Sequence, residues 1–396
     1  MSEGILASMT RTDGETVLSP VHAYAIFSAQ YAPHAGGVES FTQRLAHELA
    51  MQGNRVFVVT SQLSANTPAY EVQDDGVEVC RLPCRPLLDG RLPISRKNAD
   101  YQHMLEELAT RGIDRVLVNT RFYQLSLEGA RFAKRIGVPV IVLDHGSAHL
   151  TFGGGGIDWF VERYEHAVTR RMRHLGPAFA GISQASRNWL THFGIETAAV
   201  IPNAIDVEQF KDGASERDFR DELHAHDKTL VAFVGRLEPE KGALPFAQAA
   251  TLLGDGFVCA LAGDGSQREQ IACQGFDNVA LLGKLDQADL SALLRDADVF
   301  CLPTRSEGFC TSLLEAAAQG CVPVMPHVGG TDEVMGFDPV RHGVMLKSCE
   351  PADVAQAIRE ATTQRASGED LSAFVTAECC WGKTVDALEA AFTSLS

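Results

Sequence analysis

The sequence predicts an α/β protein built from two Rossmann-like domains, each a parallel sheet covered by helices. Strand-like and helix-like stretches alternate along almost the whole chain, a pattern typical of parallel sheets. The chain has 396 residues, which suggests two domains at roughly 100–200 residues per domain. The alternation stops in a charged, turn-rich stretch over 206–227 and then starts again. We therefore place the first domain in residues 1–206 and the second in residues 207–380.

The expected elements follow the apolar runs and the helical periodicity of the sequence. In the first domain we expect strands over 22–27, 55–60, 77–82, 115–118, 138–143 and 178–182, and helices over 39–52 and 98–111. In the second we expect strands over 230–234, 257–262, 279–282, 299–302 and 322–325, and helices from 243 and over 266–273, 288–296 and 312–319. Residues 1–20 are polar and lack the apolar region of a signal peptide, so we expect a disordered extension there.

Composition excludes several classes of protein. Hydrophobic residues make up 45% of the chain, enough for a full core, and the net charge of −17 disfavours nucleic acid as a partner. None of the ten cysteines forms a C-x-x-C pair, which indicates reduced thiols in a cytoplasmic protein and neither a disulfide framework nor a zinc site. No apolar run reaches the 18 or so residues of a membrane span.

Two short patterns suggest a metal but are better explained without one. Asp296-Ala297-Asp298 matches a D-x-D metal motif, yet it precedes an expected strand, where Asp298 is better placed to end a helix. His145 and His149 have helical metal spacing, but Gly146 interrupts a helix and no third ligand is evident. We therefore expect no metal site.

A basic loop follows the first strand of the second domain. Gly235-Arg236-Leu237 and Pro239-Glu240-Lys241-Gly242 lie at its carboxyl end, the edge where open α/β sheets bind ligands. Arg236 and Lys241 together suit a diphosphate, the first as a two-pronged donor and the second as a point charge. The alternative is that both cations pair with Glu238 and Glu240 on a solvated loop.

A second loop follows the expected strand over 299–302. Glu307 lies on this loop, and backbone amides from Gly308 to Thr311 face a phosphate if a helix begins near Ser312. Glu307 has no evident structural role, which favours ligand binding. Glu315, one turn into the helix, has a structural alternative, because Ser312-x-x-Glu315 is a capping box.

In the first domain, Gly36 and Gly37 separate the first strand from a helix. Two glycines there allow close approach of the backbone to a ligand, and the helix N-terminus favours an anion. The alternative is an ordinary tight turn in which Glu39 favours the first helical turn.

Taken together, these motifs resemble the retaining glycosyltransferases of family four, and the resemblance extends from about residue 22 over nearly the whole chain. The spaced glutamates Glu307 and Glu315 are its most specific part. The resemblance implies the GT-B fold, with two Rossmann-like domains facing across a donor-binding cleft and a C-terminal helix, 381–396, that packs back on the first domain. The further matching segments are Ile201-Pro202-Asn203-Ala204-Ile205-Asp206 and Ala262-Gly263-Asp264-Gly265.

The resemblance also implies roles for individual residues. Arg236 and Lys241 hold the donor diphosphate and stabilise it as a leaving group, while Glu307 binds the donor sugar and Glu315 the ribose. The resemblance further places Gly36, Gly37, Gly308, Phe309, Cys310 and Thr311 around the donor. Cys310 departs from the family pattern, which has glycine at this position. His145 lies where such enzymes place a polar residue near the sugar, although it could instead satisfy the end of a strand.

One helix bears on the acceptor. Over 158–175, apolar residues fall on one face and a basic stripe, including Arg163, Arg170 and Arg173, on the other. Such a stripe suits an acceptor diphosphate or anionic lipid; the alternative is a packed helix with a solvated basic face. The segments 144–150 and 183–190 resemble bacterial enzymes of surface-polysaccharide assembly, which use lipid-linked acceptors at the cytoplasmic membrane face.

We therefore expect a retaining, metal-independent glycosyltransferase that uses a UDP- or GDP-sugar and needs no cofactor. Its expected acceptor is a saccharide, lipid-linked in polysaccharide or glycoconjugate synthesis, and its expected location is the cytoplasm, peripherally at the inner face of the plasma membrane. The alternatives are a GT-B enzyme that is not a transferase, such as an epimerase or a phosphorylase, and a catalytically silent nucleotide-sugar-binding partner. The sequence leaves open the donor sugar, the base, the acceptor, the linkage and the oligomeric state.

Overall fold

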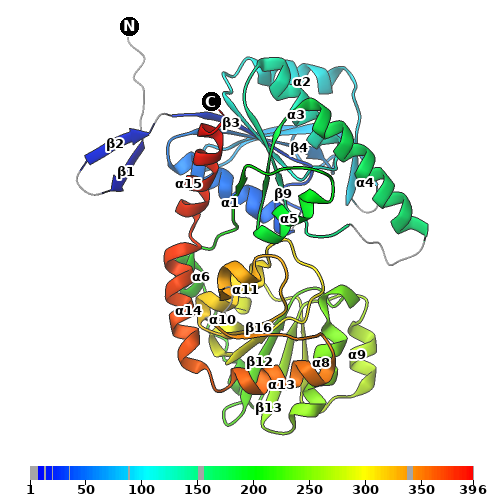
Figure 1. The fold of residues 1–396 in the computed structure, drawn as a ribbon, viewed down its shortest axis with the longest axis vertical. Coiled ribbons are helices and arrows are strands. Elements are labelled where there is room, and N and C mark those ends of the chain that lie inside the picture. Colours follow the sequence, from blue (N-terminus) through cyan, green and yellow to red (C-terminus); the bar gives the residue numbers. More distant parts are fainter. Residues whose placement is uncertain are drawn as a thin grey trace. The chain divides into compact units, whose positions relative to one another are not determined.

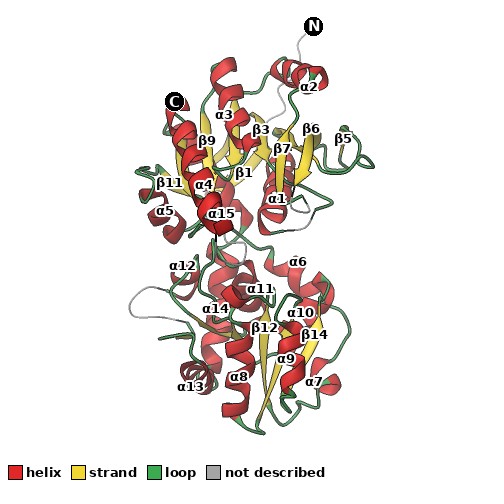
Figure 2. Ribbon diagram, turned by 90° about the vertical axis from the view of Figure 1, so that its right-hand side faces the viewer, coloured by secondary structure: helices red, strands yellow, loops and turns green. Residues whose placement is uncertain are grey.

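The computed structural model describes residues 8–12, 15–19, 21–34, 36–87, 90–149, 156–336 and 342–395. The chain forms two compact units, and in each of them helices cover both faces of a sheet (Figures 1 and 2). Unit 1 comprises Met1–Ile182, Ser186–Ile201 and Val385–Ser396, and unit 2 comprises Ser183–Ala185 and Pro202–Thr384. Both sheets are built mainly from parallel pairs, which confirms the predicted fold class of two Rossmann-like domains.

The sheet of unit 1 has the strand order β11-β10-β9-β8-β3-β4-β6-β5, with β7 paired to β6. Its central pairs are parallel, whereas the short edge strands β5 and β7 pair antiparallel with β6. The strands are β3 Ala23–Ser28, β4 Arg55–Gln62, β5 Tyr70–Val72, β6 Glu78–Leu87, β7 Leu92–Ser95, β8 Arg115–Asn119, β9 Val140–Asp144, β10 Ala178–Gly181 and β11 Ala199–Val200. The helices are α1 Gly37–Met51, α2 Ala99–Ala109, α3 Gln124–Ile136, α4 Gly156–Leu175, α5 Gln184–Thr191 and α15 Trp381–Thr393; the first residues of α5 and of α15 are assigned to unit 2.

Local sequence explains these boundaries. Every residue of β3 is buried, as expected for a central strand covered on both faces. The side chain of Asn98 caps α2 by accepting a hydrogen bond from the Tyr101 backbone amide at 3.1 Å. Gly137 ends α3 in the left-handed conformation.

Unit 2 contains a six-stranded parallel sheet in the order β14-β13-β12-β15-β16-β17. The strands are β12 Thr229–Val234, β13 Phe257–Ala262, β14 Val279–Gly283, β15 Val299–Cys301, β16 Val322–Met325 and β17 Val344–Met345. The helices are α6 Val207–Asp212, α7 Phe219–Glu222, α8 Ala243–Leu253, α9 Arg268–Gln274, α10 Gln287–Asp296, α11 Thr311–Gln319, α12 Thr331–Met335, α13 Pro351–Ala361 and α14 Arg365–Glu378, with a short 3-10 turn, η1, at Pro239–Lys241.

The structure corrects the expectation for residues 1–20. In place of a disordered extension, β1 (Ser8–Thr12) and β2 (Glu15–Ser19) pair as a two-stranded antiparallel ribbon. The sequence signal is the dipeptide Asp13-Gly14 between them, which is typical of tight hairpins. The remaining residues of this extension lie outside the described residues.

A buried polar network fixes the end of the chain to unit 1. Glu389 on α15 accepts hydrogen bonds from the Tyr24 hydroxyl and the Arg115 guanidinium, and Arg115 also donates to the Tyr24 oxygen at 2.6 Å. Arg115 lies 5.3 Å from the centre of the Phe392 ring. Because Arg115 is only 9% exposed, the Glu389 carboxylate is needed to compensate its buried positive charge.

We predict that Glu389→Ala destabilises unit 1 by about 2–3 kcal/mol, because it leaves a buried guanidinium without its counter-charge. Denaturant unfolding followed by circular dichroism measures the change. Lys383→Ala, on the same helix, is the control: its pair with Glu378 is half-exposed on both sides, so about 0.5 kcal/mol or less is expected. Equal losses in the two variants would contradict a supporting role for the network.

Candidate active site

The sheet of unit 2 has a switch point between β12 and β15. From β12 the chain moves outward through β13 to β14, then returns to the other side of β12 at β15. The loops that leave the carboxyl ends of these two neighbouring strands therefore diverge, and open α/β sheets bind their ligands in the crevice between such loops. The loop 235–242 follows β12 and the loop 302–310 follows β15.

Lys241 and Glu307 meet at this switch point. The Lys241 Nζ lies 2.5 Å from a carboxylate oxygen of Glu307, and the two side chains are only 17% and 11% exposed. These residues come from different loops, 66 positions apart in the sequence. The structure thus brings together two of the predicted catalytic residues in a partly desolvated ion pair.

Backbone contacts between the two loops hold this pair in place. Gly242 has a φ of +75°, and a Cβ atom there would lie 2.2 Å from the Pro303 carbonyl oxygen. Only glycine therefore fits without moving the backbone. Beside it, the Glu240 carbonyl accepts hydrogen bonds from the Arg305 amide at 2.8 Å and from the Thr304 hydroxyl at 3.2 Å.

Arg236 behaves differently from Lys241. Its side chain is 58% exposed and its guanidinium lies 3.1 Å from Glu240, which is the pairing that the alternative interpretation of this loop predicts. Glu238 instead accepts hydrogen bonds from the amide and the hydroxyl of Ser266, at 3.0 and 2.5 Å. Arg236 is therefore an exposed cation at the edge of the switch point, whereas Lys241 lies within it.

The predicted capping box at the start of α11 is wrong. The helix begins at Thr311, so its N-cap is Cys310, and the helix start has no side-chain capping bond. Ser312 is already inside the helix and cannot cap it. The structural explanation offered for Glu315 is thereby removed.

Glu315 is a desolvated carboxylate near the N-terminus of α11. Burial raises its pKa to about 7 from an ordinary 4.5. Within the described part of the chain, no hydrogen bond or ion pair involves this carboxyl group. A partly buried carboxyl group without a partner costs stability and is therefore a strong candidate for ligand binding.

Gly308, Phe309, Cys310 and Thr311 form the turn at the N-terminus of α11. Cys310 has a φ of +65°, a conformation that favours glycine, which explains why the family pattern has glycine there. The Gly308 carbonyl accepts a hydrogen bond from Ser183 at 2.7 Å, and the buried Phe309 ring packs on Gly330. Thr311 opens the helix, so the first amides of α11 point toward this turn.

In unit 1, His145 lies just beyond the carboxyl end of β9. Its Nε2 lies 3.1 Å from the Asn119 side-chain oxygen at the end of β8, and Asn119 in turn donates to the Thr42 hydroxyl at 2.7 Å. Burial lowers the pKa of His145 to about 3, so the ring is neutral at physiological pH. The contact with Asn119 fits the alternative role of His145, in which the side chain satisfies the end of a strand. Its role beside a sugar stays a prediction.

Gly36 and Gly37 lie where β3 leads into α1. The Glu39 carboxylate folds back over Gly36, where an added Cβ would lie 2.2 Å from a carboxylate oxygen. Gly37 is exposed, with open space within 4 Å of its Cβ position. Glu39 therefore supplies the negative charge that the start of α1 favours, as the tight-turn alternative predicts.

The faces of α4 are as predicted. Val168 and Met172 are buried, whereas Arg163, Arg170 and Arg173 are exposed. Sequence reasoning missed an aromatic pair at the start of this helix: Trp159 is 53% exposed and Phe160 is 67% exposed. The sequence contained a signal for this pair. Two adjacent aromatic residues on the exposed side of an amphipathic helix are unusual where that side contacts only solvent.

The rejected metal motif is structural. Asp298 accepts a hydrogen bond from the Leu230 amide at 2.9 Å and pairs with Arg220, also at 2.9 Å. Asp296 accepts from the Phe219 amide at 2.8 Å. Asp298 directly precedes β15, so both aspartates lie toward the amino end of this strand, opposite the switch point.

Comparisons with known proteins agree with this geometry. The family model described as glycosyltransferase family 4 matches residues 35–209, and that described as glycosyl transferases group 1 matches residues 214–375. The chain is 27% identical over 331 residues to a GDP-mannose-dependent alpha-mannosyltransferase of Mycolicibacterium smegmatis, covering 81% of this chain and 84% of the relative. It is also 27% identical over 391 residues to a D-inositol 3-phosphate glycosyltransferase of Geodermatophilus obscurus, covering 92% and 86%.

Among solved structures, the fold is similar to HepE of Anabaena in complex with UDP, with a TM-score of 0.70, 17% identity, and coverage of 94% of this chain and 100% of that one. It is similar as well to sucrose-phosphate synthase of Thermosynechococcus elongatus, with a TM-score of 0.72, 18% identity, and coverage of 94% and 99%. With both halves of the chain matched, this protein belongs to the family-four glycosyltransferases of the GT-B fold.

Proposed function

We propose that this enzyme transfers a sugar from a UDP- or GDP-sugar to a lipid-linked saccharide acceptor, with retention of configuration and without a metal at the donor site. The observation that carries the proposal is the partly desolvated pair of Lys241 and Glu307 at the switch point of unit 2. A cation and a carboxylate at this position match the two needs of the reaction: a counter-charge for a departing diphosphate and an acceptor for sugar hydroxyl groups.

Lys241 is the proposed electrostatic catalyst. Without donor, its charge is balanced by Glu307 at 2.5 Å. A diphosphate at the switch point adds negative charge next to this ammonium group, and the attraction grows as the bond to the sugar breaks and charge moves onto the leaving group. Arg236, exposed at the edge of the same loop, can turn from Glu240 toward the diphosphate.

We assign the remaining donor contacts from the family resemblance. Glu307 accepts hydrogen bonds from the sugar hydroxyls, and Glu315 accepts them from the ribose, which would give its carboxylate the partners that it lacks. The amides of Gly308, Phe309, Cys310 and Thr311 face the phosphates at the start of α11. For Gly36, Gly37 and His145, which belong to unit 1, contact with the donor stays the expectation that the family resemblance implies.

The relatives support a nucleotide-sugar donor but differ in its identity. The mycobacterial relative is named for GDP-mannose, whereas structures of HepE contain UDP or UDP-glucose.

Release of free nucleoside diphosphate only when acceptor is present would distinguish a transferase from an epimerase or a phosphorylase. The anomeric coupling constant of the product, measured by ¹H NMR, tests retention.

The helix α4 supports contact with a lipid-linked acceptor at the inner face of the plasma membrane. No helix in the described ranges is both long and apolar enough to cross a membrane. The exposed rings of Trp159 and Phe160 lie on α4 together with Arg163, whose guanidinium is 4.9 Å from the Trp159 ring. Aromatic side chains beside a basic stripe are typical of helices that lie in a lipid interface.

We predict opposite effects of two variants on ligand binding. Lys241→Ala removes the counter-charge, so transfer falls at least about 100-fold and affinity for nucleoside diphosphate also falls. Glu307→Gln removes the competing carboxylate, so nucleoside diphosphate binds at least as tightly as to the wild type while transfer is lost. Calorimetry and a transfer assay measure the two quantities.

The matched control for Lys241→Ala is Lys228→Ala, which removes the same positive charge from an exposed lysine at the opposite end of β12. Its binding and turnover are expected to stay at wild-type values. Wild-type turnover in Lys241→Ala would remove the proposed site.

For Glu315 we predict a specific pH dependence of stability without donor. Its carboxyl ionises near pH 4.5 when the chain is unfolded but near pH 7 when it is folded. Ionisation of Glu315 in the folded state therefore costs stability. This cost is absent below about pH 4.5 and reaches its full size above about pH 7. Relative to Glu315→Gln, the wild type should lose about 1–3 kcal/mol of unfolding free energy between pH 5 and pH 8.

Parallel denaturant titrations of the two proteins at each pH measure this difference, because all other titrating groups are shared. A constant difference between them from pH 5 to pH 8 would show that Glu315 is not desolvated.

We further predict that Trp159→Ala with Phe160→Ala weakens binding to vesicles containing anionic lipid at least about fivefold, because the apolar anchor is lost. Sedimentation with vesicles of stated composition measures the affinity. Transfer to a short, water-soluble acceptor should be unchanged. Leu252→Ala, an exposed apolar residue on unit 2, is the control; an equal loss there, or no loss in the double variant, would contradict the role of α4.

A further inference from the structure

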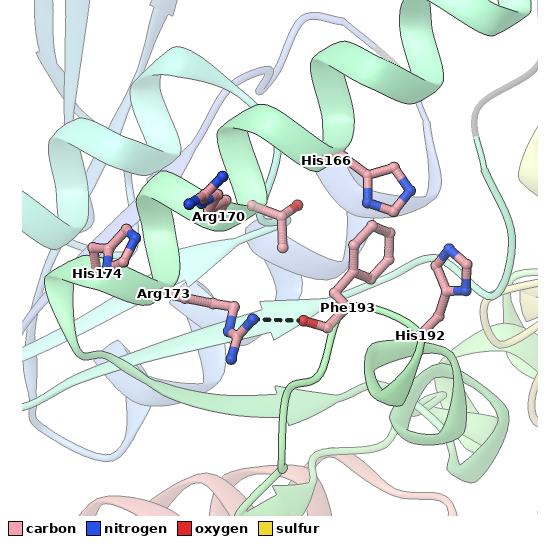
Figure 3. A pocket seen from close by; sticks show the side chains of 7 residues that line it. His166, Arg170, Arg173, His174, His192 and Phe193 are labelled. Carbon is pink, nitrogen blue, oxygen red and sulfur yellow. Dashed lines mark hydrogen bonds between the residues drawn. The ribbon is translucent and has the colours of Figure 1, made fainter.

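Three histidines gather on one side of unit 1. His149 follows β9, His166 lies on α4, and His192 follows the end of α5. One ring nitrogen of each lies within 4.8 Å of those of the other two. Figure 3 shows His166 and His192 at one end of a pocket, with Arg170, Arg173 and His174 toward the other.

His149 is oriented as a metal ligand would be. Its Nδ1 lies 2.9 Å from a carboxylate oxygen of Glu165, which is itself held by the buried guanidinium of Arg121. A carboxylate on one ring nitrogen fixes the ring and leaves the other nitrogen for the metal, the usual arrangement around histidine-bound metals. The Nε2 of His149 therefore faces the cluster.

A carboxylate lies on the open side of the cluster. One oxygen of Glu162 is 3.6 Å from the His149 Nε2 and 3.9 Å from the His166 Nε2. Three imidazoles and one carboxylate are a ligand set that Zn²⁺ accepts in a tetrahedral site, with metal–ligand distances of about 2.0–2.2 Å. Such distances place nitrogen ligands about 3.3 Å apart, so the rings need to approach by about 1.5 Å.

His166 and His192 are both exposed, so side-chain rotation of these two residues can close this distance. On the other side, the cluster rests on aromatic rings: Trp189 stacks on His192 with a centroid distance of 4.9 Å and an interplanar angle of 4°, and meets His149 edge-on at 4.8 Å. The rings are thus held near one another without a covalent constraint.

We propose that His149, His166 and His192 bind one divalent transition-metal ion of the zinc class, with Glu162 or water as the fourth ligand. The ion joins the loop after β9, the helix α4 and the segment after α5. This site contains none of the residues assigned to the donor, so it is independent of the metal-free transfer proposed above. Sequence spacing missed it because its three ligands come from three separate segments, and His145, the partner that the spacing suggested for His149, instead contacts Asn119.

The test uses the full-length protein after removal of metal by a chelator. Zn²⁺ is titrated by calorimetry, and Ni²⁺ and Co²⁺ serve as spectroscopic probes. We expect one Zn²⁺ per chain, a Co²⁺ visible spectrum of the tetrahedral type, and quenching of Trp189 fluorescence by Ni²⁺. Quenching that persists in Trp189→Phe, or a stoichiometry of zero, would overturn the proposal.

The variants His166→Ala and His192→Ala each remove one ligand from an exposed position and should weaken Zn²⁺ binding at least about tenfold. Their thermal unfolding in chelator should match that of the wild type, which shows that they fold. His174→Ala is the matched control, since His174 is exposed on the same helix and lines the same pocket but lies outside the cluster. Equal Zn²⁺ affinity in His192→Ala and His174→Ala would overturn the proposal.

Discussion

The parallel pairing of β12 with β15 is the constraint on which the proposed donor site of unit 2 depends. Val231 pairs with Val299 and Ala232 with Phe300, so two strands far apart in the sequence end at the same edge. The loops beyond them diverge because the chain leaves β12 in one direction and enters β15 from the other. Because both loops begin at this edge, Lys241 and Glu307 can meet there.

Much of this arrangement could be predicted from sequence, because it depends on continuous apolar strands and on glycines at strand ends. The strand expected over 230–234 is observed at 229–234, and the helix expected over 312–319 begins one residue earlier. The short antiparallel strands β5 and β7 were not predicted, since edge strands of three or four residues carry little periodic signal. Tertiary contacts, and not local pattern, determine such strands.

The site itself shows where sequence reasoning reaches its limit. Spacing placed Arg236 and Lys241 on one loop, where both would face the same diphosphate. In the structure, Lys241 on η1 contacts Glu307, whereas Arg236 is exposed beside Glu240. The capping box failed for a similar reason: it assumed a helix start at Ser312, whereas the left-handed backbone of Cys310 starts the helix earlier. Backbone dihedral angles decide both cases, and the sequence pattern alone does not reveal them.

A buried arginine connects His145 with the proposed metal site of unit 1. Arg121 is fully buried and bonds to two carboxylates, Asp144 at 2.5 Å and Glu165. Asp144 directly precedes His145, while Glu165 orients His149, so one guanidinium positions both histidines. Burial raises the pKa of the Asp144 carboxyl, and the nearby Arg121 guanidinium opposes that shift. The Glu165 carboxylate lies between the Arg121 guanidinium and the His149 Nδ1, so the contact that fixes the ring of His149 leaves its other nitrogen available to an ion.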